Sequence, residues 1–337
     1  MREKEHRTKI IGEVAQAHDG SLGRAHAFID LAKECGLDGI KFQTHIAEYE
    51  SSRLEPWRVK FSYQDKDRYD YWKRMEFTSE QWKGLIDHAN EVGLEFIGTP
   101  FSIESFEMLW NNGVRIFKVA SGEVTNSFLL RKIGEKSEKI YISSGMSSWN
   151  ELDNAFTILN DGNADIVIMQ CTTMYPTPAQ FWGLNIISEM QQRYAVPIGY
   201  SDHSGTIYSG LAAATLGIDV LEVHMCMDKF DFGPDTSSSL TREELKELVQ
   251  GIHMIDIAVN NPTDKNKISE CFEETHIMFS KSIALKHDMK SGAKIKYTDL
   301  LLLKPMVGIP ASQIDCVVGK VLKNDKKKGY FIEYGDI

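Results

Sequence analysis

The stretch PIGYSDHSGTIYSGLAAATLGIDVLEVHMC, residues 197 to 226, decides the fold. Its two short apolar runs, 197–203 and 220–226, are typical of buried β-strands, and the helix-like residues 206–218 separate them. This order predicts a βαβ unit with parallel strands. His203 closes the first run and His224 lies near the end of the second. Two imidazoles on neighbouring strand ends can share one metal ion, and the alternative is two hydrogen-bonded core histidines.

The same alternation of strand-like and helix-like segments extends outward over the first 260 residues. The predicted strands are 9–16, 39–45, 95–101, 115–123, 139–145, 165–172, 197–203 and 220–227. Amphipathic stretches lie between them, and Gly36, Gly93 and the Thr241–Glu244 capping box mark helix ends. The pattern predicts a (β/α)8 TIM barrel over residues 1–260. An open doubly wound sheet is the alternative, but no GxGxxG fingerprint follows a strand.

Two further segments depart from this alternation. Residues 46–78 are too long for an ordinary loop, so we expect them to cover the active face or contact a partner, with a solvated excursion as the alternative. A turn-rich stretch begins near residue 260, which predicts a linker over 261–280. Residues 281–337 then predict a small β-rich domain, whose core would need a docking surface.

Composition narrows the class of protein. With 42% hydrophobic and 26% charged residues, the chain is typical of globular proteins, and its net charge of −10 argues against nucleic acid as a partner. We expect no membrane partner and a cytoplasmic location, because no apolar run is long enough to span a bilayer and the first residues lack a signal-peptide core. The five scattered cysteines indicate reduced thiols.

Polar side chains occupy nearly every predicted strand end. They are Glu13, Lys41, Gln43, Thr99, Lys118, Ser121, Glu123, Ser144, Thr172, Tyr175, Ser201, Asp202, His203 and His224. Lys41 and Lys118 lie inside apolar strands, where a lysine needs a negative partner. They either clamp a phosphate or carboxylate, or form internal salt bridges with Glu13 and Glu123. Asp235, in the loop after the eighth strand, binds a hydroxylated substrate or is a plain turn residue.

The residues alone therefore predict a barrel enzyme that binds an anionic small molecule beside a divalent metal. Aldol-like condensation, metal-assisted hydrolysis and isomerisation all remain open at this point.

Several motifs together resemble those of the sialic acid synthase family. The matching stretches are GEVAQAHDGSLGRA, GIKFQTH, GTPFS, KVASGEVTN, ISSGMSS, QCTTMYPTP, GYSDHSG and EVHMCMDKFDFGPD. They cover most of the chain in the expected order, and residues 281–337 resemble the family's C-terminal SAF, or antifreeze-like, domain. The resemblance implies a metal-dependent condensation of phosphoenolpyruvate with an open-chain N-acylmannosamine-type sugar, giving a nonulosonic acid and phosphate.

The resemblance also implies roles for individual residues. His203 and His224 would bind the metal, most often Mn²⁺, with Mg²⁺ or Co²⁺ as alternatives, and Glu13 would act beside it in catalysis. The residues expected to bind phosphoenolpyruvate are Lys41, Thr99, Lys118, Ser121, Ser144 and Ser201. Those expected to face the sugar are Gln43, Glu123, Tyr175 and Asp235, with Lys304 joining them from a partner chain in a domain-swapped homodimer.

Two departures from the family pattern leave the acceptor open. Lys304 stands where many members have an arginine, and lysine lacks the planar guanidinium fork. Val223 replaces the arginine that usually precedes the second histidine. A legionaminic- or pseudaminic-type precursor, another aldose or a sugar phosphate are alternative acceptors. A non-catalytic sugar-binding barrel is the alternative outside the class of enzymes.

Overall fold

A computed structural model describes residues 6–267 and 271–337 of the chain. The chain divides into two compact units, Met1–Asn261 and Pro262–Ile337. Each unit is described by itself.

Parallel strands of the first unit close into a barrel, in which β8 pairs with β1. The strands are β1 (Lys9–Ala15), β2 (Gly39–Thr44), β3 (Glu95–Pro100), β4 (Ile116–Val119), β5 (Lys139–Ser143), β6 (Asp165–Cys171), β7 (Ile198–Asp202) and β8 (Val220–Met225). Each pairs with the next in sequence, so the predicted (β/α)8 barrel is confirmed. A short strand that the sequence did not predict, β9 (Ser239–Leu240), pairs with β8 beside His224.

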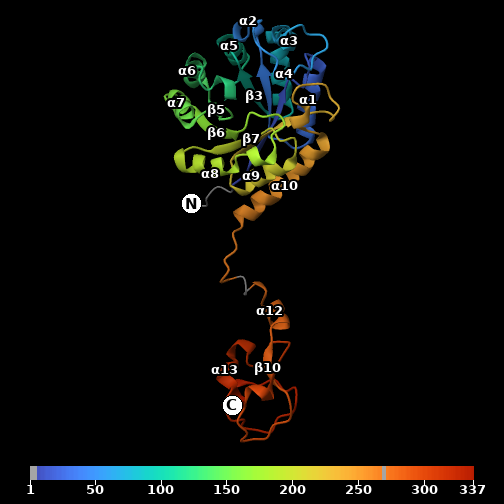
Figure 1. Cartoon of the computed structure of the whole chain (residues 1–337), viewed down its shortest axis with the longest axis vertical. Helices are drawn as coiled ribbons and strands as arrows, with labels where there is room; N and C mark the ends of the chain where they lie inside the picture. The colour runs from blue at the N-terminus through green and yellow to red at the C-terminus, as the bar shows by residue number, and fades with distance from the viewer. Residues whose placement is uncertain (1–5, 268–270) are drawn as a thin grey trace. The chain divides into compact units, whose positions relative to one another are not determined.

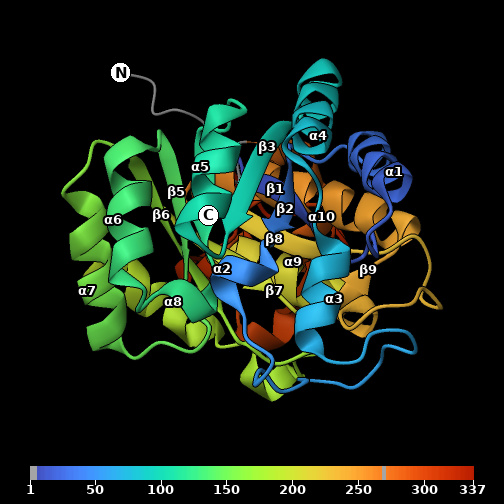
Figure 2. The same cartoon turned by 90° about the horizontal axis from the view of Figure 1, so that it is seen from above.

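At least one helix follows each barrel strand, and one helix per strand contributes to a ring around the strands (Figure 2). They are α1 (Leu22–Glu34), α4 (Ser79–Glu91), α5 (Ile103–Asn111), α6 (Ser127–Lys136), α7 (Trp149–Asn160), α8 (Leu184–Arg193), α9 (Ile207–Thr215) and α10 (Arg242–Asn260). The predicted ends of three helices are confirmed. Gly36 and Gly93 adopt φ angles of 78° and 74°, which glycine tolerates, and Thr241 with Glu244 forms a capping box on α10.

Two apolar layers hold the barrel together. The larger lies between strands and helices and includes Phe28, Phe42 and Phe117. The smaller packs inside the barrel and consists of Ile11, Ile97, Tyr141, Val167, Met169 and Val220. Because strand side chains alternate between faces, Ile11 shares its face with Glu13, and Val220 shares its face with Glu222 and His224. The apolar interior thus lies beneath polar groups at the carboxyl ends of the strands.

The fourth strand is shorter than predicted. It ends at Val119, and Ser121–Glu123 form a 3₁₀ turn, η1, so the predicted strand 115–123 is wrong at its end. The short side chain of Ser121 and the glycine at 122 favour a turn over continued pairing. Ser121 and Glu123 consequently sit on a loop above the barrel.

The 46–78 segment forms helices with a packed apolar cluster and is not a solvent-exposed loop. It contains α2 (Ala47–Glu50) and α3 (Arg68–Met75), and Tyr71, Trp72 and Met75 pack with Ala47 in an apolar cluster of their own. Trp57, Phe61 and Tyr69 pack against that cluster. In Figure 1, α2 and α3 lie side by side at the top of the first unit.

The second unit is a small β-containing fold. Its elements are α12 (Glu273–Phe279), β10 (Ser282–Leu285), η4 (Tyr297–Asp299), β11 (Leu300–Leu303), η5 (Ala311–Gln313), α13 (Ile314–Val317) and η6 (Tyr334–Asp336). Strands β10 and β11 are antiparallel, and isolated bridges join other extended stretches. Ile283, Leu285, Ile309, Leu322 and Ile332 form its core. Helix α12 lies within residues 261–280, which the sequence predicted as a linker.

Across residues 6–267 and 271–337, no helix combines the length and the apolarity needed to cross a membrane.

Candidate active site

A cavity of about 350 Å³ opens at the carboxyl ends of the barrel strands. Its lining includes residues predicted from the sequence, namely Glu13, Lys41, Gln43, Thr99, Lys118, Ser121, Glu123, Tyr175, His203, His224 and Asp235. It also includes residues that the sequence did not single out, among them Gln16, His45, Glu50, Arg58, Arg68, Trp72, Ser143 and Glu222. The cavity therefore gathers side chains from most of the strands and from the 46–78 segment.

A buried network of charges lies at the bottom of this cavity. Lys41 Nζ is 2.6 Å from Glu13 Oε2 and 3.7 Å from Glu222 Oε1, and Lys118 Nζ is 2.6 Å from the same Glu222 oxygen. All four side chains are 5% exposed or less. Lys41 forms an internal salt bridge with Glu13, which the sequence offered as the alternative to an anion clamp. The suggested partner of Lys118 was wrong, because Glu222 and not Glu123 pairs with it.

Hydroxyl groups complete the surroundings of the two lysines. Lys41 Nζ donates to Thr99 Oγ1 at 3.2 Å, and Lys118 Nζ donates to Ser201 Oγ at 2.6 Å. Burial disfavours charge on Lys41, but Glu13 and Glu222 outweigh it and raise the lysine's pKa. Burial raises the pKa of Glu13, whereas Lys118 and Lys41 overcome burial at Glu222 and lower its pKa. The arrangement keeps the ammonium group of Lys41 charged although its side chain is almost fully buried.

His203 and His224 face one another beside this network. Their ring centroids are 5.1 Å apart with the planes at 73°, and Glu13 is the register partner of His224 on the neighbouring strand. His203 Nδ1 lies 2.8 Å from the carbonyl oxygen of Thr172, which can only accept, so this nitrogen carries the proton. Burial lowers the pKa of His224 well below its usual value, which keeps a lone pair on that imidazole.

The donor set suits a divalent metal ion with open coordination positions. Within the described residues, no group of three His, Cys, Asp or Glu side chains has the spacing of a closed metal site. The imidazoles at the end of β7 and on β8 are suitable ligands in their neutral forms, and the remaining positions would belong to water and substrate. The backbone carbonyl of Thr172 fixes the orientation of His203, as outer hydrogen bonds do at metal sites.

The upper wall of the cavity is built around Tyr175 and Asp235. Tyr175 stacks on His203 with centroids 4.1 Å apart, and burial raises the tyrosine's pKa far above its usual range. Arg58, from the 46–78 segment, lies 4.1 Å above the Tyr175 ring and 2.5 Å from Asp235 Oδ1. Burial also raises the pKa of Glu123, which accepts a hydrogen bond from Asn126.

Three predicted site residues do not line the cavity. Ser201 reaches it through hydrogen bonds to Lys118 and Glu222, which line the cavity. Ser144 points away, since it donates to Gln170 Oε1 at 3.2 Å and accepts from Cys171 N, while its neighbour Ser143 lines the cavity. Lys304 belongs to the second unit, where its Nζ lies 5.1 Å from the Phe279 ring centroid.

Comparison with known proteins identifies the family. Residues 28–264 match the family model described as "NeuB family". The chain belongs to the NeuB family. It is a sialic acid synthase-type enzyme.

Individual relatives cover nearly the whole chain. The chain is similar to the N,N'-diacetyllegionaminic acid synthase of Campylobacter jejuni, with 32% identity over 97% of this chain and 99% of the relative. It is 34% identical to the human N-acetylneuraminate-9-phosphate synthase, over 94% of this chain and 89% of the relative. The crystal structure of the N-acetylneuraminic acid synthetase of Leptospira borgpetersenii covers 80% of this chain and 92% of its own, with 25% identity and a TM-score of 0.71.

The site of this NeuB-family chain holds residues that sequence reasoning missed. Glu222 lies two residues before His224, so strand alternation places both on the inward face, and this signal was available. Arg58 had no comparable signal, because the 46–78 segment shows no simple period. No sequence pattern indicated His45 and Glu50 as site residues either, because their contact depends on the turn that leads into α2.

Proposed function

We propose that this enzyme condenses phosphoenolpyruvate with the open-chain form of an N-acylmannosamine-type sugar, giving a nonulosonic acid and inorganic phosphate. The observation that carries the proposal is the pair of buried lysines, Lys41 and Lys118, beside two facing imidazoles at the carboxyl ends of the strands. Two fixed ammonium groups suit a small molecule that carries both a phosphate and a carboxylate.

Binding of phosphoenolpyruvate would place its anionic groups near Lys41 and Lys118, with hydroxyl donors from Thr99 and Ser121, which line the cavity. Ion pairs with Glu13 and Glu222 already orient both lysines, so little reorganisation accompanies binding. Ser143 lines the cavity and supplies a hydroxyl group that Ser144, hydrogen-bonded to Gln170, does not. Positioning and electrostatics would supply much of the rate.

The chemistry forms one carbon–carbon bond and breaks one carbon–oxygen bond. The methylene carbon of phosphoenolpyruvate attacks the aldehyde carbon, whose oxygen takes up a proton to become a hydroxyl group. Water adds to the adjacent enol carbon and gives up a proton, which leaves a hydroxyl group on that carbon. The bond from the carbon to the phosphate oxygen then breaks, while the hydroxyl loses its proton to the departing phosphate and becomes the keto group of the product. Glu13, whose pKa is raised by burial, stands where it can exchange these protons.

His203 and His224 are the proposed metal ligands. A bound Mn²⁺, or alternatively Mg²⁺ or Co²⁺, would polarise the sugar carbonyl as a Lewis acid. Gln43, Glu123, Tyr175 and Asp235 are the proposed contacts of the sugar. Their amide, carboxylate and phenol groups are suited to hydroxyl and N-acyl substituents.

Residues 281–337 are proposed to be an SAF domain that covers the barrel of a partner chain in a domain-swapped homodimer. This unit is small and counts 13 Lys against 10 Asp or Glu over residues 262–337, whereas the whole chain is acidic. Several apolar side chains of this unit are exposed, including Phe279, Leu303 and Val307. Lys304 lies among them and would reach the partner's sugar site.

The identity of the acceptor sugar is the most specific part of the proposal. Relatives named as legionaminic, pseudaminic and N-acetylneuraminate-9-phosphate synthases make a related aldose or a sugar phosphate the principal alternative. A non-catalytic sugar-binding barrel is the other alternative. It has no need for two buried lysine–carboxylate pairs beside an imidazole pair.

Phosphate release tests the proposal directly. The enzyme would be incubated with phosphoenolpyruvate, Mn²⁺ and a panel of N-acylated hexosamines, their 6-phosphates and plain aldoses. We expect release that requires an N-acylated sugar and is lost in His203→Ala. Release with none of these sugars, or undiminished release in His203→Ala, would overturn the proposal.

A further inference from the structure

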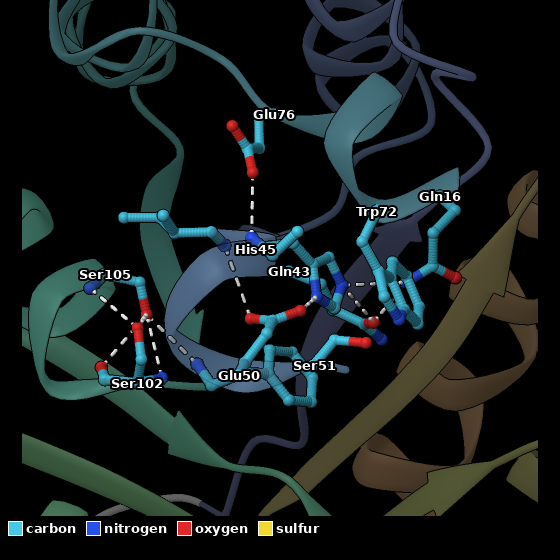
Figure 3. A network of polar contacts seen from close by, with 12 residues as sticks. Gln16, Gln43, His45, Glu50, Ser51, Trp72, Glu76, Ser102 and Ser105 are labelled. Atoms are coloured by element: carbon cyan, nitrogen blue, oxygen red, sulfur yellow. Dashed lines mark hydrogen bonds and ion pairs between the residues drawn. The ribbon is translucent and has the colours of Figure 1, made fainter. Parts of the chain in front are cut away.

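A buried histidine in the wall of the cavity takes no direct part in the chemistry described above. His45 is 4% exposed, and its ring lies between the rings of Trp72 and Phe101, with centroid distances of 4.0 and 4.4 Å and nearly parallel planes. Its neighbours include Gln16, Gln43, Glu50 and Trp72 (Figure 3). An imidazole sandwiched in this way has little freedom to turn, so its two nitrogens point in fixed directions.

Glu50 determines which nitrogen of His45 carries the proton. Its Oε1 lies 2.6 Å from His45 Nδ1, and its Oε2 accepts from the backbone N–H of Ile46 at 3.3 Å. Both carboxylate oxygens therefore accept, and Nδ1 donates. The other nitrogen, Nε2, lies 3.2 Å from Gln16 Nε2, which can only donate, and 3.4 Å from Gln43 Oε1, which can only accept, and we assign its lone pair to the shorter contact.

Two glutamine amides continue this hydrogen-bonded chain to Glu13. Gln16 Nε2 lies 3.2 Å from His45 Nε2 and donates to Gln43 Oε1 at 2.5 Å. Gln43 Nε2 in turn donates to Glu13 Oε1 at 2.7 Å. Each amide orientation is fixed by its neighbour, because a reversed Gln16 would turn its carbonyl oxygen toward that of Gln43.

The chain of contacts has one direction, from Glu50 through His45, Gln16 and Gln43 to Glu13. It ends on the carboxylate whose other oxygen is paired with Lys41. None of its members contacts Lys118 or Ser201, which bind each other on the opposite side of the site. Gln43 lines the cavity, and its amide is one of the proposed sugar contacts.

We propose that His45 and Glu50 are positioning residues for the sugar half of the reaction, which hold the amide of Gln43 with its NH₂ group toward Glu13. The inference rests on the proposed condensation. It also gives the 46–78 segment a role, since Glu50 comes from α2 and Trp72 from α3. A purely structural role for His45 would be limited to the packing of its ring.

Matched variants separate these two roles. His45→Phe keeps an aromatic ring between Trp72 and Phe101 but removes both nitrogens. Glu50→Ala removes the acceptor of Nδ1–H, whereas Glu50→Gln keeps an oxygen that can accept it. Glu76→Gln is the control, because Glu76 binds the backbone N–H of Ala47 in the same segment.

We expect these variants to lose catalytic efficiency toward the sugar and to keep their affinity for phosphoenolpyruvate. His45→Phe and Glu50→Ala should lower kcat/KM for the sugar by about 10- to 100-fold, as loss of orienting groups commonly does, while KM for phosphoenolpyruvate stays within about twofold. Glu50→Gln should restore most activity, and Glu76→Gln should resemble wild type. The double variant His45→Phe/Glu50→Ala should be no worse than His45→Phe, because both disrupt one chain of contacts.

Three kinetic outcomes would overturn the inference: a parallel rise in KM for phosphoenolpyruvate, additive losses in the double variant, or an equal loss in Glu76→Gln. If the wild-type enzyme turned over none of the sugars, the proposed function would be refuted and these kinetic tests could not be run. A second measurement, which needs no turnover, tests the positioning role by itself. Nitrogen NMR of His45 in the full chain should show a neutral ring protonated at Nδ1. A ring protonated at Nε2, or at both nitrogens, at neutral pH would refute the positioning role.

Discussion

Replacing Lys118 by methionine removes one charge from the buried network while keeping a side chain of similar length. Lys118 and Glu222 are 2.6 Å apart, and both side chains are 5% exposed or less. Removing one partner of a buried ion pair costs about 3–5 kcal/mol, because the other charge is left without compensation. Lys41 remains 3.7 Å from the same Glu222 oxygen and compensates in part. We therefore expect a loss near the lower limit, about 3 kcal/mol of unfolding free energy at pH 7.

The loss should depend on pH in a defined direction. In the wild type, burial raises the pKa of Glu222, but Lys118 and Lys41 outweigh burial and lower it below its usual 4.5. A depressed carboxyl pKa contributes stability above 4.5 that is lost as pH falls through the folded value. Without Lys118, burial dominates and the pKa of Glu222 rises. As the pH falls, protonation of Glu222 then removes the uncompensated buried charge from the variant and recovers part of its lost stability. The difference in unfolding free energy between the variant and the wild type should therefore be smaller at pH 5 than at pH 7.

Urea denaturation followed by tryptophan fluorescence measures this gap. All six tryptophans lie between residues 57 and 182, so the signal reports on the first unit alone. Lys139→Met is the control, because Lys139 is only half-buried on β5 and burial lowers its pKa, and we expect a change of about 1 kcal/mol or less. Equal unfolding free energies for Lys118→Met and wild type at pH 7, or a gap that is unchanged at pH 5, would refute the reasoning.

Four further predictions concern the metal site, the second unit, a glycine and a buried histidine. His203→Ala and His224→Ala should each abolish Mn²⁺ binding and turnover while leaving the fold intact, and metal-dependent activity equal to wild type in either variant would contradict the ligand assignment. Truncation at about residue 280 should convert a dimer to a monomer in sedimentation and lower sugar affinity, with an unchanged tryptophan signal; full activity of the truncated chain would count against the homodimer. Gly183→Ala should cost about 1–3 kcal/mol of unfolding free energy, since Gly183 has φ +66° and an added Cβ would lie 2.4 Å from Gln170 Nε2; Gly84→Ala on α4 meets no atom within 4 Å and should not destabilise the protein. Burial lowers the pKa of His18 to about 3, so acidification from pH 7 to pH 5 should cost the wild type about 2 kcal/mol more than His18→Asn, as measured by urea denaturation.

The sequence by itself determined the barrel and the face that carries the site. Eight apolar runs separated by amphipathic stretches predict parallel strands covered by helices, because parallel strands need helical crossovers and bury both faces. The absence of a GxGxxG fingerprint then favoured a closed barrel over an open doubly wound sheet. The same rule assembles the carboxyl ends of the strands at one end of the barrel, so Glu13, Lys41, Lys118, His203 and His224 were expected together. Strand alternation alone could also have added Glu222, which shares the inward face with His224.

Only the tertiary structure decided which of these groups contact one another. The pairing of Lys118 with Glu222 rather than Glu123 follows from the turn that ends β4 at Val119 and carries Glu123 onto a loop. Arg58, His45 and Glu50 reach the site because the 46–78 segment packs its own aromatic cluster across the barrel mouth. Sequence spacing encodes the direction of a side chain within a strand or a helix. Contacts between distant segments depend instead on how loops close and pack, which no local period records.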